Sequence, residues 1–196
     1  MARNPERRAA LVDAAVEVLA AEGARGLTFR AVDTAAGVPI GTSSNYFANR
    51  DDLLHQIDGW LHQRLAPKPE IIEKLLARPR DRALVTAFMH DMMDRVRGDR
   101  TGFLALMEMR LEASRRPELR ASLMTSLRGD LDSGIAFNAE AGLPGDAEDI
   151  TLLYLGMLGL ILEQLTMPGM LDGAIPGVSV PDGVVERLVE RIVPAG

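Results

Sequence analysis

The sequence predicts an all-α protein, and three observations support this. Apolar residues recur three and four positions apart in almost every segment, which is the period of an amphipathic helix. No segment alternates apolar and polar residues between turns, as a half-buried strand would. Aromatic residues, which favour strands, make up only 4% of the chain. We therefore expect a bundle of about nine to ten helices.

A first helix is predicted over residues 5–22. Its apolar stripe consists of Leu11, Ala14, Ala15, Val18 and Leu19. Gly23 follows the stripe directly, where glycine commonly ends a helix. A second, short helix is predicted from Thr28 to Ala35, because the Thr28 hydroxyl can cap its first turn.

A third helix is predicted over residues 39–46, after a tight turn at Gly37. Pro39 is tolerated in the first turn of a helix, where a backbone N–H has no partner in the helix. A fourth helix is expected over residues 50–65, with Asn49 as its N-cap.

Six longer helices, separated by Pro, Gly and Asp, account for most of the remaining chain. They are expected over residues 70–77, 80–97, 100–115, 117–141, 147–166 and 182–193. Residues 167–181 are predicted to form a long irregular loop. We divide the chain into a small domain of residues 1–50 and a larger helical domain of residues 51–196.

Composition excludes several classes of site. The chain of 196 residues has no cysteine, so disulfides, iron–sulfur clusters, thiolate zinc sites and a cysteine nucleophile are excluded, and a cytoplasmic location is expected. The longest apolar run, residues 150–162, is shorter than the roughly 20 residues that a membrane span needs, so membrane insertion is not expected. The net charge of −6 argues against nucleic-acid binding if charge alone is considered.

The spacing of the second and third helices indicates a helix-turn-helix unit. The third helix is rich in small or polar residues, which are Gly41, Thr42, Ser43, Ser44, Asn45 and Tyr46. Such residues suit a recognition helix, which offers hydroxyls, amides and backbone N–H groups to a DNA groove. A solvated surface helix would explain the composition of this one segment equally well.

Residues 7–54 as a whole resemble the N-terminal DNA-binding domain of the tetracycline-repressor (TetR) family of bacterial transcriptional regulators. The matching pieces are Glu22-Gly23, Leu27-Thr28, Ala36-Gly37-Val38, Gly41-Thr42 and Tyr46-Phe47, followed by Arg50 and Leu53-Leu54, in the family's order and spacing. Residues 101–120 also resemble the C-terminal domain of an actinobacterial-type branch, although less specifically.

The resemblance implies DNA contacts, to which the composition of the third helix adds Gly41 and Ser44. The candidate DNA-binding residues are Thr28, Arg30, Gly41, Thr42, Ser44, Asn45, Tyr46 and Arg50. Arg50 stands where the family has a phosphate-binding Lys. Three positions depart from the family pattern: Ser44 replaces a Tyr, Pro39 a Ser N-cap, and Asp33 an Ala.

Local charge weakens the argument from net charge. Residues 1–55 contain six Arg and seven acidic residues, so most of the net negative charge lies in the later part of the chain. We expect Arg3, Arg7 and Arg8 of the N-terminal arm to face the duplex, with simple disorder of the arm as the alternative.

The larger domain is expected to bind an unidentified small apolar or amphipathic ligand. Methionine and phenylalanine side chains recur in its successive helices, and flexible thioethers suit an adaptable pocket. The candidate ligand-binding residues are Met89, Met93, Phe103, Met107, Phe137 and Met157. Filling of the bundle core is the simpler explanation for each of these residues taken singly.

A homodimer is expected through residues 154–165 and 184–192, which resemble the family's dimer-forming helix pair. Gly156 and Gly159 would let a partner helix approach closely. The resemblance as a whole implies a repressor that binds a palindromic DNA operator as a dimer and is released by the ligand.

An enzyme is not expected, because the sequence contains no Gly-rich phosphate loop, nucleophile elbow or His-Glu-x-x-His motif. No cofactor is expected either. His55, Asp58 and His62 share a helix face and are possible metal ligands, but a solvated helix face is the simpler explanation. The alternative overall function is a helical small-molecule-binding protein without operator recognition.

Overall fold

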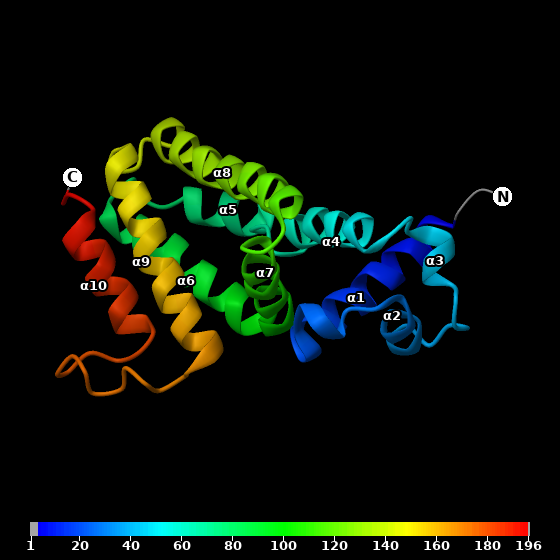
Figure 1. Cartoon of the computed structure of the whole chain (residues 1–196). Helices are drawn as coiled ribbons and strands as arrows, with labels where there is room; N and C mark the ends of the chain where they lie inside the picture. The colour runs from blue at the N-terminus through cyan, green and yellow to red at the C-terminus, as the bar shows by residue number, and fades with distance from the viewer. Residues whose placement is uncertain (1–3, 196) are drawn as a thin grey trace. The chain divides into compact units, whose positions relative to one another are not determined.

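The structure is a computed structural model that describes residues 4–195, and those residues form ten α-helices and no strand (Figure 1). The helices are α1 (Pro5–Gly26), α2 (Phe29–Ala35), α3 (Ser43–Tyr46), α4 (Arg50–Arg64), α5 (Pro69–Leu76), α6 (Arg82–Gly98), α7 (Arg100–Ala113), α8 (Pro117–Glu140), α9 (Ala147–Thr166) and α10 (Asp182–Ile192). The all-α prediction is confirmed, and the connection between α9 and α10 is a run of turns, as expected.

Packing divides the chain into two compact units. The first consists of Met1–Ala66 and Asp99–Ser126, and the second of Pro67–Gly98 and Leu127–Gly196. Helix α8 contributes its first turns to one unit and its later turns to the other. These units follow packing rather than function, so the functional boundary at residue 50 stays a prediction.

In the first unit, α1 is the central helix and packs against α2, α4 and α7. The stripe predicted from the sequence is buried, since Leu11, Ala15 and Leu19 have no exposed surface. Gly23 interrupts the helix with a φ of 68°, a left-handed conformation that glycine adopts without a Cβ clash. The helix therefore breaks at the predicted glycine and continues to Gly26 for one further turn.

An ion cluster ties α1, α4 and α7 together around Arg64. The guanidinium binds both carboxylate oxygens of Asp99, at 2.5 and 2.7 Å, and also reaches Asp13 at 3.1 Å. Asp99 additionally caps α7, because its side chain accepts a hydrogen bond from the Gly102 backbone N–H at 3.0 Å. The hydrogen bond from Arg64 is the main reason that the pKa of Asp99 is lowered.

Asp99→Asn is expected to lower the free energy of unfolding by about 1–2 kcal/mol, because it weakens a cap and a bidentate ion pair. The wild-type contribution is present above the ordinary pKa of an aspartate and is lost as the pH falls through the lowered pKa of Asp99. Thermal melts of both proteins across the acidic range should therefore converge at low pH. A constant difference in melting temperature at every pH would contradict this role.

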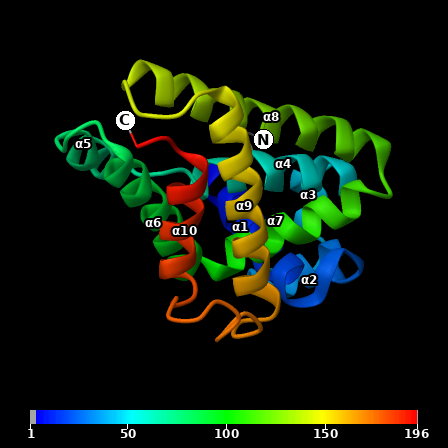
Figure 2. The ribbon, with the colours of Figure 1, turned by 90° about the vertical axis from the view of Figure 1, so that its left-hand side faces the viewer.

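In the second unit, α10 packs against both α6 and α9, and Figures 1 and 2 show these three helices side by side. Val185 and Val189 of α10 are completely buried. A Cβ added to Gly156 of α9 would lie 3.0 Å from a methyl group of Leu188, so this glycine permits close approach of α10 within one chain. Gly159 has open space around it instead.

Helix α9 is the one helix among the described residues that is long and apolar enough to cross a membrane. Length and apolar composition alone are weak evidence for a span, because core helices of bundles share them. One-third of its most apolar window is buried, and the helix packs against α6 and α10. A bundle helix accounts for these contacts.

Candidate nucleic-acid interface

Helix α2 begins where the sequence predicted. The Thr28 hydroxyl accepts a hydrogen bond from the Ala31 backbone N–H at 3.1 Å and so caps the first turn. Val32 points into the core and has no exposed surface, whereas Thr28 and Arg30 are exposed. The two candidate DNA-binding residues of this segment are therefore open to solvent.

The prediction that the third helix begins at residue 39 was wrong, since α3 spans only Ser43–Tyr46. Gly41 has a φ of 95°, which is incompatible with a right-handed helix at this position. A hydrogen bond from the Gly41 backbone N–H to the Asp33 carboxylate, 2.7 Å long, holds this conformation. Residues 39–42 consequently form turns instead of the predicted first turn of helix.

Asp33 also caps α3, from the preceding helix. The other carboxylate oxygen accepts hydrogen bonds from the Ser43 backbone N–H at 2.7 Å and from the Ser43 hydroxyl at 2.5 Å. The residue at the N-cap position, Thr42, makes no capping hydrogen bond of its own. Asp33 and Ser43 are both completely buried, so three hydrogen bonds compensate for taking the carboxylate out of water. This departure from the family pattern thus orients the start of α3.

Polar side chains of α3 and its preceding turn remain exposed. The Ser44 hydroxyl and the Asn45 amide donate to the Gly41 carbonyl, at 2.7 and 3.2 Å, and the Thr42 hydroxyl donates to the Pro39 carbonyl at 2.5 Å. Gly41, Ser44 and Asn45 are exposed, and Thr42 and Tyr46 are half-buried. These side chains bond only to nearby carbonyls and retain hydrogen-bonding capacity toward an external partner.

Sequence reasoning missed two residues of this region. Asp33 departs from the family pattern, and its position in the sequence did not predict its role. Ile40, in the turn before α3, has 61% of its surface exposed and is not among the predicted site residues. The sequence Pro39-Ile40-Gly41 could have predicted this exposure, because a large side chain in a tight turn is not buried in the core.

The N-terminal arm is only partly described, because Arg3 lies outside the described residues. Arg8, which was expected to face the duplex, instead donates to the Tyr46 carbonyl at 3.0 Å and lies 5.7 Å from the centre of the Phe47 ring. Its guanidinium therefore connects the start of α1 to the end of α3. Arg7 is exposed, as expected for a residue that could reach a phosphate.

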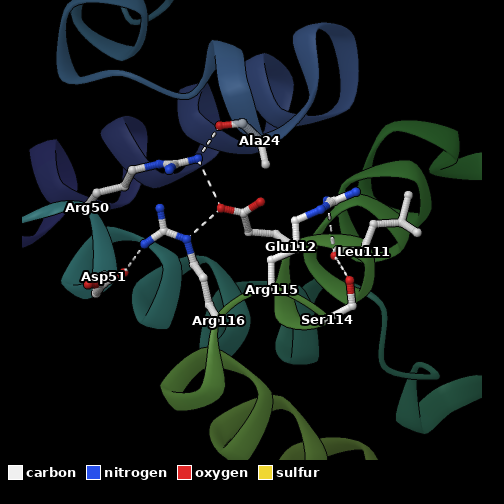
Figure 3. A network of polar contacts seen from close by, with 8 residues as sticks. All are labelled: Ala24, Arg50, Asp51, Leu111, Glu112, Ser114, Arg115 and Arg116. Atoms are coloured by element: carbon white, nitrogen blue, oxygen red, sulfur yellow. Dashed lines mark hydrogen bonds and ion pairs between the residues drawn. The ribbon is translucent and has the colours of Figure 1, made fainter.

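Arg50 begins α4, but its guanidinium is bound within the first unit (Figure 3). One terminal nitrogen donates to the Ala24 carbonyl and lies 3.5 Å from Glu112 of α7. Glu112 also accepts a hydrogen bond from Arg116 at 2.5 Å, and Arg116 in turn binds Asp51 at 2.7 Å. The hydrogen bond to Glu112 raises the pKa of Arg116. The guanidinium expected to bind phosphate thus contacts a backbone carbonyl and a carboxylate in the structure.

The six candidate ligand-binding residues are divided between the two units. Phe103 and Met107 belong to the first unit, and Met89, Met93, Phe137 and Met157 to the second. Phe103, Met93 and Met157 are buried, and Phe137 packs edge-on against Phe88 with ring centres 5.5 Å apart. A shallow pocket of about 280 Å³ at the corner between α7 and α8 contains none of the six.

The expectation of a solvated face on α4 is wrong for Asp58, which is buried, and both Asp58 and His55 contact serine hydroxyls of α8. Asp58 is buried and accepts a hydrogen bond from the Ser126 hydroxyl at 2.9 Å, while His55 lies 3.2 Å from the Ser122 hydroxyl. No group of three potential metal ligands occurs among residues 4–195. Asp58 and His55 therefore join α4 to the start of α8 within the first unit.

Comparisons with known proteins agree with this architecture. Residues 11–57 match the family model described as bacterial regulatory proteins, tetR family, and residues 80–195 match the one described as tetracyclin repressor-like, C-terminal domain. No curated protein matches the chain.

Several solved structures are similar over almost their whole length. A TetR-family member from Streptomyces coelicolor A3 is 26% identical with a TM-score of 0.71, covering 97% of this chain and 99% of that one. The multidrug binding protein EbrR, solved with imidazole, is 25% identical with a TM-score of 0.68, covering 98% of both chains. EbrR has also been solved with proflavin, ethidium and malachite green.

A transcriptional regulator from Rhodococcus sp. shares the fold at 20% identity, with a TM-score of 0.67 and coverage of 96% of this chain and 97% of that one. Together, the two family models cover the capped helix-turn-helix and most of the later helices. The chain therefore belongs to the TetR family of bacterial regulatory proteins.

Proposed function

We propose that the protein is a cytoplasmic transcriptional repressor that binds a palindromic operator as a homodimer and releases it when a small molecule binds. The observation that carries the proposal is the exposed polar surface of α3, whose first turn Asp33 caps. Because the buried carboxylate of Asp33 fixes the start of α3, the exposed side chains of this helix can contact a major groove. No catalytic role is part of the proposal.

Eight residues are assigned to DNA, with different tasks. Arg30 of α2 and Thr42, Ser44 and Asn45 near α3 have the exposure and the hydrogen-bonding groups for base edges or phosphates. Thr28 is exposed at the start of α2, where backbone N–H groups favour an anion, so it can lie against a DNA phosphate. Gly41 permits close approach of a phosphate, and Tyr46 and Arg50 would contact the DNA backbone.

Ile40 joins this surface as an apolar contact. Its side chain is 61% exposed in the turn that precedes α3. In the major groove the methyl group of thymine is the one apolar feature of a base edge. We therefore propose that Ile40 contacts the methyl group of a thymine in each half-site.

Arg50 must exchange one anionic partner for another if it binds DNA. Glu112 lies 3.5 Å from the guanidinium and is only 12% exposed, and the Nε of Arg50 is buried without a hydrogen-bond partner. A phosphate would have to compete with Glu112 for this arginine. The network in Figure 3 therefore links the DNA-contacting end of α4 to α7.

Arg50→Ala and Tyr46→Ala should test the docking surface. We expect Arg50→Ala to weaken operator binding about 10-fold and to reduce the slope of log affinity against log salt by about one, because one phosphate contact is lost. Fluorescence anisotropy on the protein's own upstream DNA measures both. Arg120→Ala is the matched control, since Arg120 is exposed in the same unit and distant in sequence from α3.

Glu112→Gln completes this test. If Glu112 competes with phosphate, its neutralisation should raise operator affinity in the wild-type background and have no effect in the Arg50→Ala background. Unchanged affinity in both Arg50→Ala and Tyr46→Ala would remove the assigned surface. Absence of any salt-sensitive specific binding by the wild type would instead favour a small-molecule-binding protein without operator recognition.

The proposed dimer uses an apolar stripe on α9. Its members lie three or four positions apart and are exposed: Leu152, Leu155, Gly159, Leu162 and Thr166. An unpartnered stripe of this kind suits association with a second copy across a two-fold axis, and Gly159 leaves room for a close helix crossing. The apolar residues of α10 are less available, because Val185 and Val189 pack within the unit.

Ligand binding is assigned to the C-terminal helical region. The support is the match of residues 80–195 to the C-terminal family model and the likeness to EbrR, whose structures contain flat aromatic molecules. We propose an apolar or amphipathic aromatic ligand, in contact with some of the methionines and phenylalanines named above. Release requires only that the ligand binds more tightly to the conformation that fits DNA poorly.

A further inference from the structure

Glu163 of α9 is a buried carboxylate that forms no ion pair with any residue from 4 to 195. Only 6% of its surface is exposed. One carboxylate oxygen, Oε2, accepts a hydrogen bond from the amide of the adjacent Gln164 at 2.6 Å, whereas Oε1 is buried and has no hydrogen-bond partner. Removing a charged carboxylate from water without compensation is costly, so this arrangement needs an explanation.

Four arginines of the second unit bind other groups. Arg95 binds Asp91 at 2.9 Å, Arg97 binds Asp94 and Asp182 at 2.7 and 2.5 Å, Arg187 binds Glu190 at 2.8 Å, and Arg82 donates to the carbonyls of Glu190 and Val193. The acidic residues in these contacts are at the surface or half-buried. Glu163 is therefore the most buried carboxylate of the second unit, and none of these four arginines binds it.

The surroundings of Glu163 along α9 are apolar. Met157, Leu160, Ile161 and Leu165 lie within two turns of it and are all buried. A bare metal ion would need further oxygen or nitrogen ligands, and residues 4–195 contain no group of three such ligands. An organic cation satisfies the carboxylate and the apolar neighbours together, because its charge or N–H group pairs with oxygen while its carbon frame meets methyl and thioether groups.

We propose that Glu163 supplies the charge recognition in the ligand site, and that the ligand is an apolar organic cation. This inference rests on the proposed ligand-binding function and adds to it a chemical class and a residue. Oε1 has no hydrogen-bond donor among residues 4–195, so it can accept a hydrogen bond from the ligand. Loss of this charge-assisted bond should weaken a cationic ligand about 10- to 100-fold.

The test uses the full-length protein without DNA and two fluorescent aromatic probes that differ in charge. Ethidium is the cationic probe, and N-phenyl-1-naphthylamine is the neutral one. We expect Glu163→Gln to weaken ethidium about 10- to 100-fold and to leave the neutral probe within about threefold of its wild-type affinity. Glu163→Asp keeps the negative charge, so it should retain part of the preference for ethidium over the neutral probe. Glu186→Gln, an exposed glutamate of α10, is the control and should change neither.

A second measurement separates recognition from packing. In the unliganded protein, Glu163→Gln should raise the melting temperature, because it removes an uncompensated buried charge while preserving shape. A structural glutamate would instead give a lower melting temperature in the variant.

Equal affinity of ethidium for the wild type and Glu163→Gln would overturn the proposal. Binding of the neutral probe alone by the wild type would overturn it as well, while leaving the proposed ligand site in place. Failure of both probes to bind would count against the ligand site itself, and operator binding would then be judged by the Arg50 and Tyr46 variants.

Discussion

Asp33→Ala is expected to abolish specific operator binding while the rest of the protein stays folded. The carboxylate accepts hydrogen bonds from the Gly41 N–H, the Ser43 N–H and the Ser43 hydroxyl. Hydrogen bonds to a charged group contribute about 1.5–3 kcal/mol each when measured singly, and buried donors left without a partner add to the loss. Helix α3 spans only four residues, so its own backbone hydrogen bonds cannot replace the stabilisation that Asp33 provides.

We expect operator affinity to fall at least about 100-fold in Asp33→Ala, because the recognition helix would no longer be held in one orientation. Hydrogen exchange should report the cause directly: the amides of Gly41 and Ser43 should lose protection, whereas amides of α1 should keep it. Circular dichroism would verify that the other helices remain.

Thr34→Ala is the matched control for Asp33→Ala. Thr34 is the next residue of α2, is exposed, and bonds only to the Arg30 carbonyl within its own helix. It should bind DNA nearly as the wild type does. Retention of operator affinity by Asp33→Ala would mean that packing around α3 suffices to orient it and that the capping role assigned to Asp33 is wrong.

Leu155→Glu is the second change with a large expected effect, because it should convert a dimer into a monomer. Leu155 lies in the middle of the exposed α9 stripe and is 56% exposed in the single chain. In a two-fold dimer the substitution enters the interface twice, and each copy buries a carboxylate without a partner at a cost of several kcal/mol. Operator affinity should fall at least about 100-fold, since each monomer contacts one half-site.

Analytical ultracentrifugation and anisotropy on the same samples would check this prediction. Leu111→Glu is the matched control, because Leu111 is also a 56% exposed leucine on a helix but lies in the first unit, away from α9 in sequence. It should remain dimeric. A Leu155→Glu protein that sediments as a dimer would place the interface on another surface.

Local signals in the sequence predicted much of the fold. The caps at Thr28 and Asn49 occur where expected, and each side chain accepts the hydrogen bond that its position implies. The interruption of α1 at Gly23 and the irregular segment before α10 also follow from local chemistry. These features depend on residues within one or two turns of each other, and such interactions can be read from spacing.

The candidate DNA-binding site was predicted less completely, and the reason lies in contacts between distant residues. The start of α3 was misplaced by four residues because the deciding carboxylate belongs to the preceding helix, eight and ten positions away. The family resemblance assigns Arg50 to DNA and local charge assigns Arg8, but neither predicted that Arg8 contacts α3 and that Arg50 contacts α1 and α7. A long, flexible, charged side chain has many reachable partners, and sequence spacing does not choose among them.

The sequence by itself determined the helical class, most helix boundaries and the family, because hydrophobic period, caps and a long run of spaced residues are properties of neighbouring positions. Only the tertiary structure decided which polar groups are satisfied and which are not. Asp33 accepts three hydrogen bonds, and Arg50 lies beside the carboxylate of Glu112. Gly156 permits close packing of α9 and α10 within one chain, and Oε1 of Glu163 has no hydrogen-bond donor among residues 4–195. Burial and pairing depend on what other helices bring to a side chain, and that information is not local.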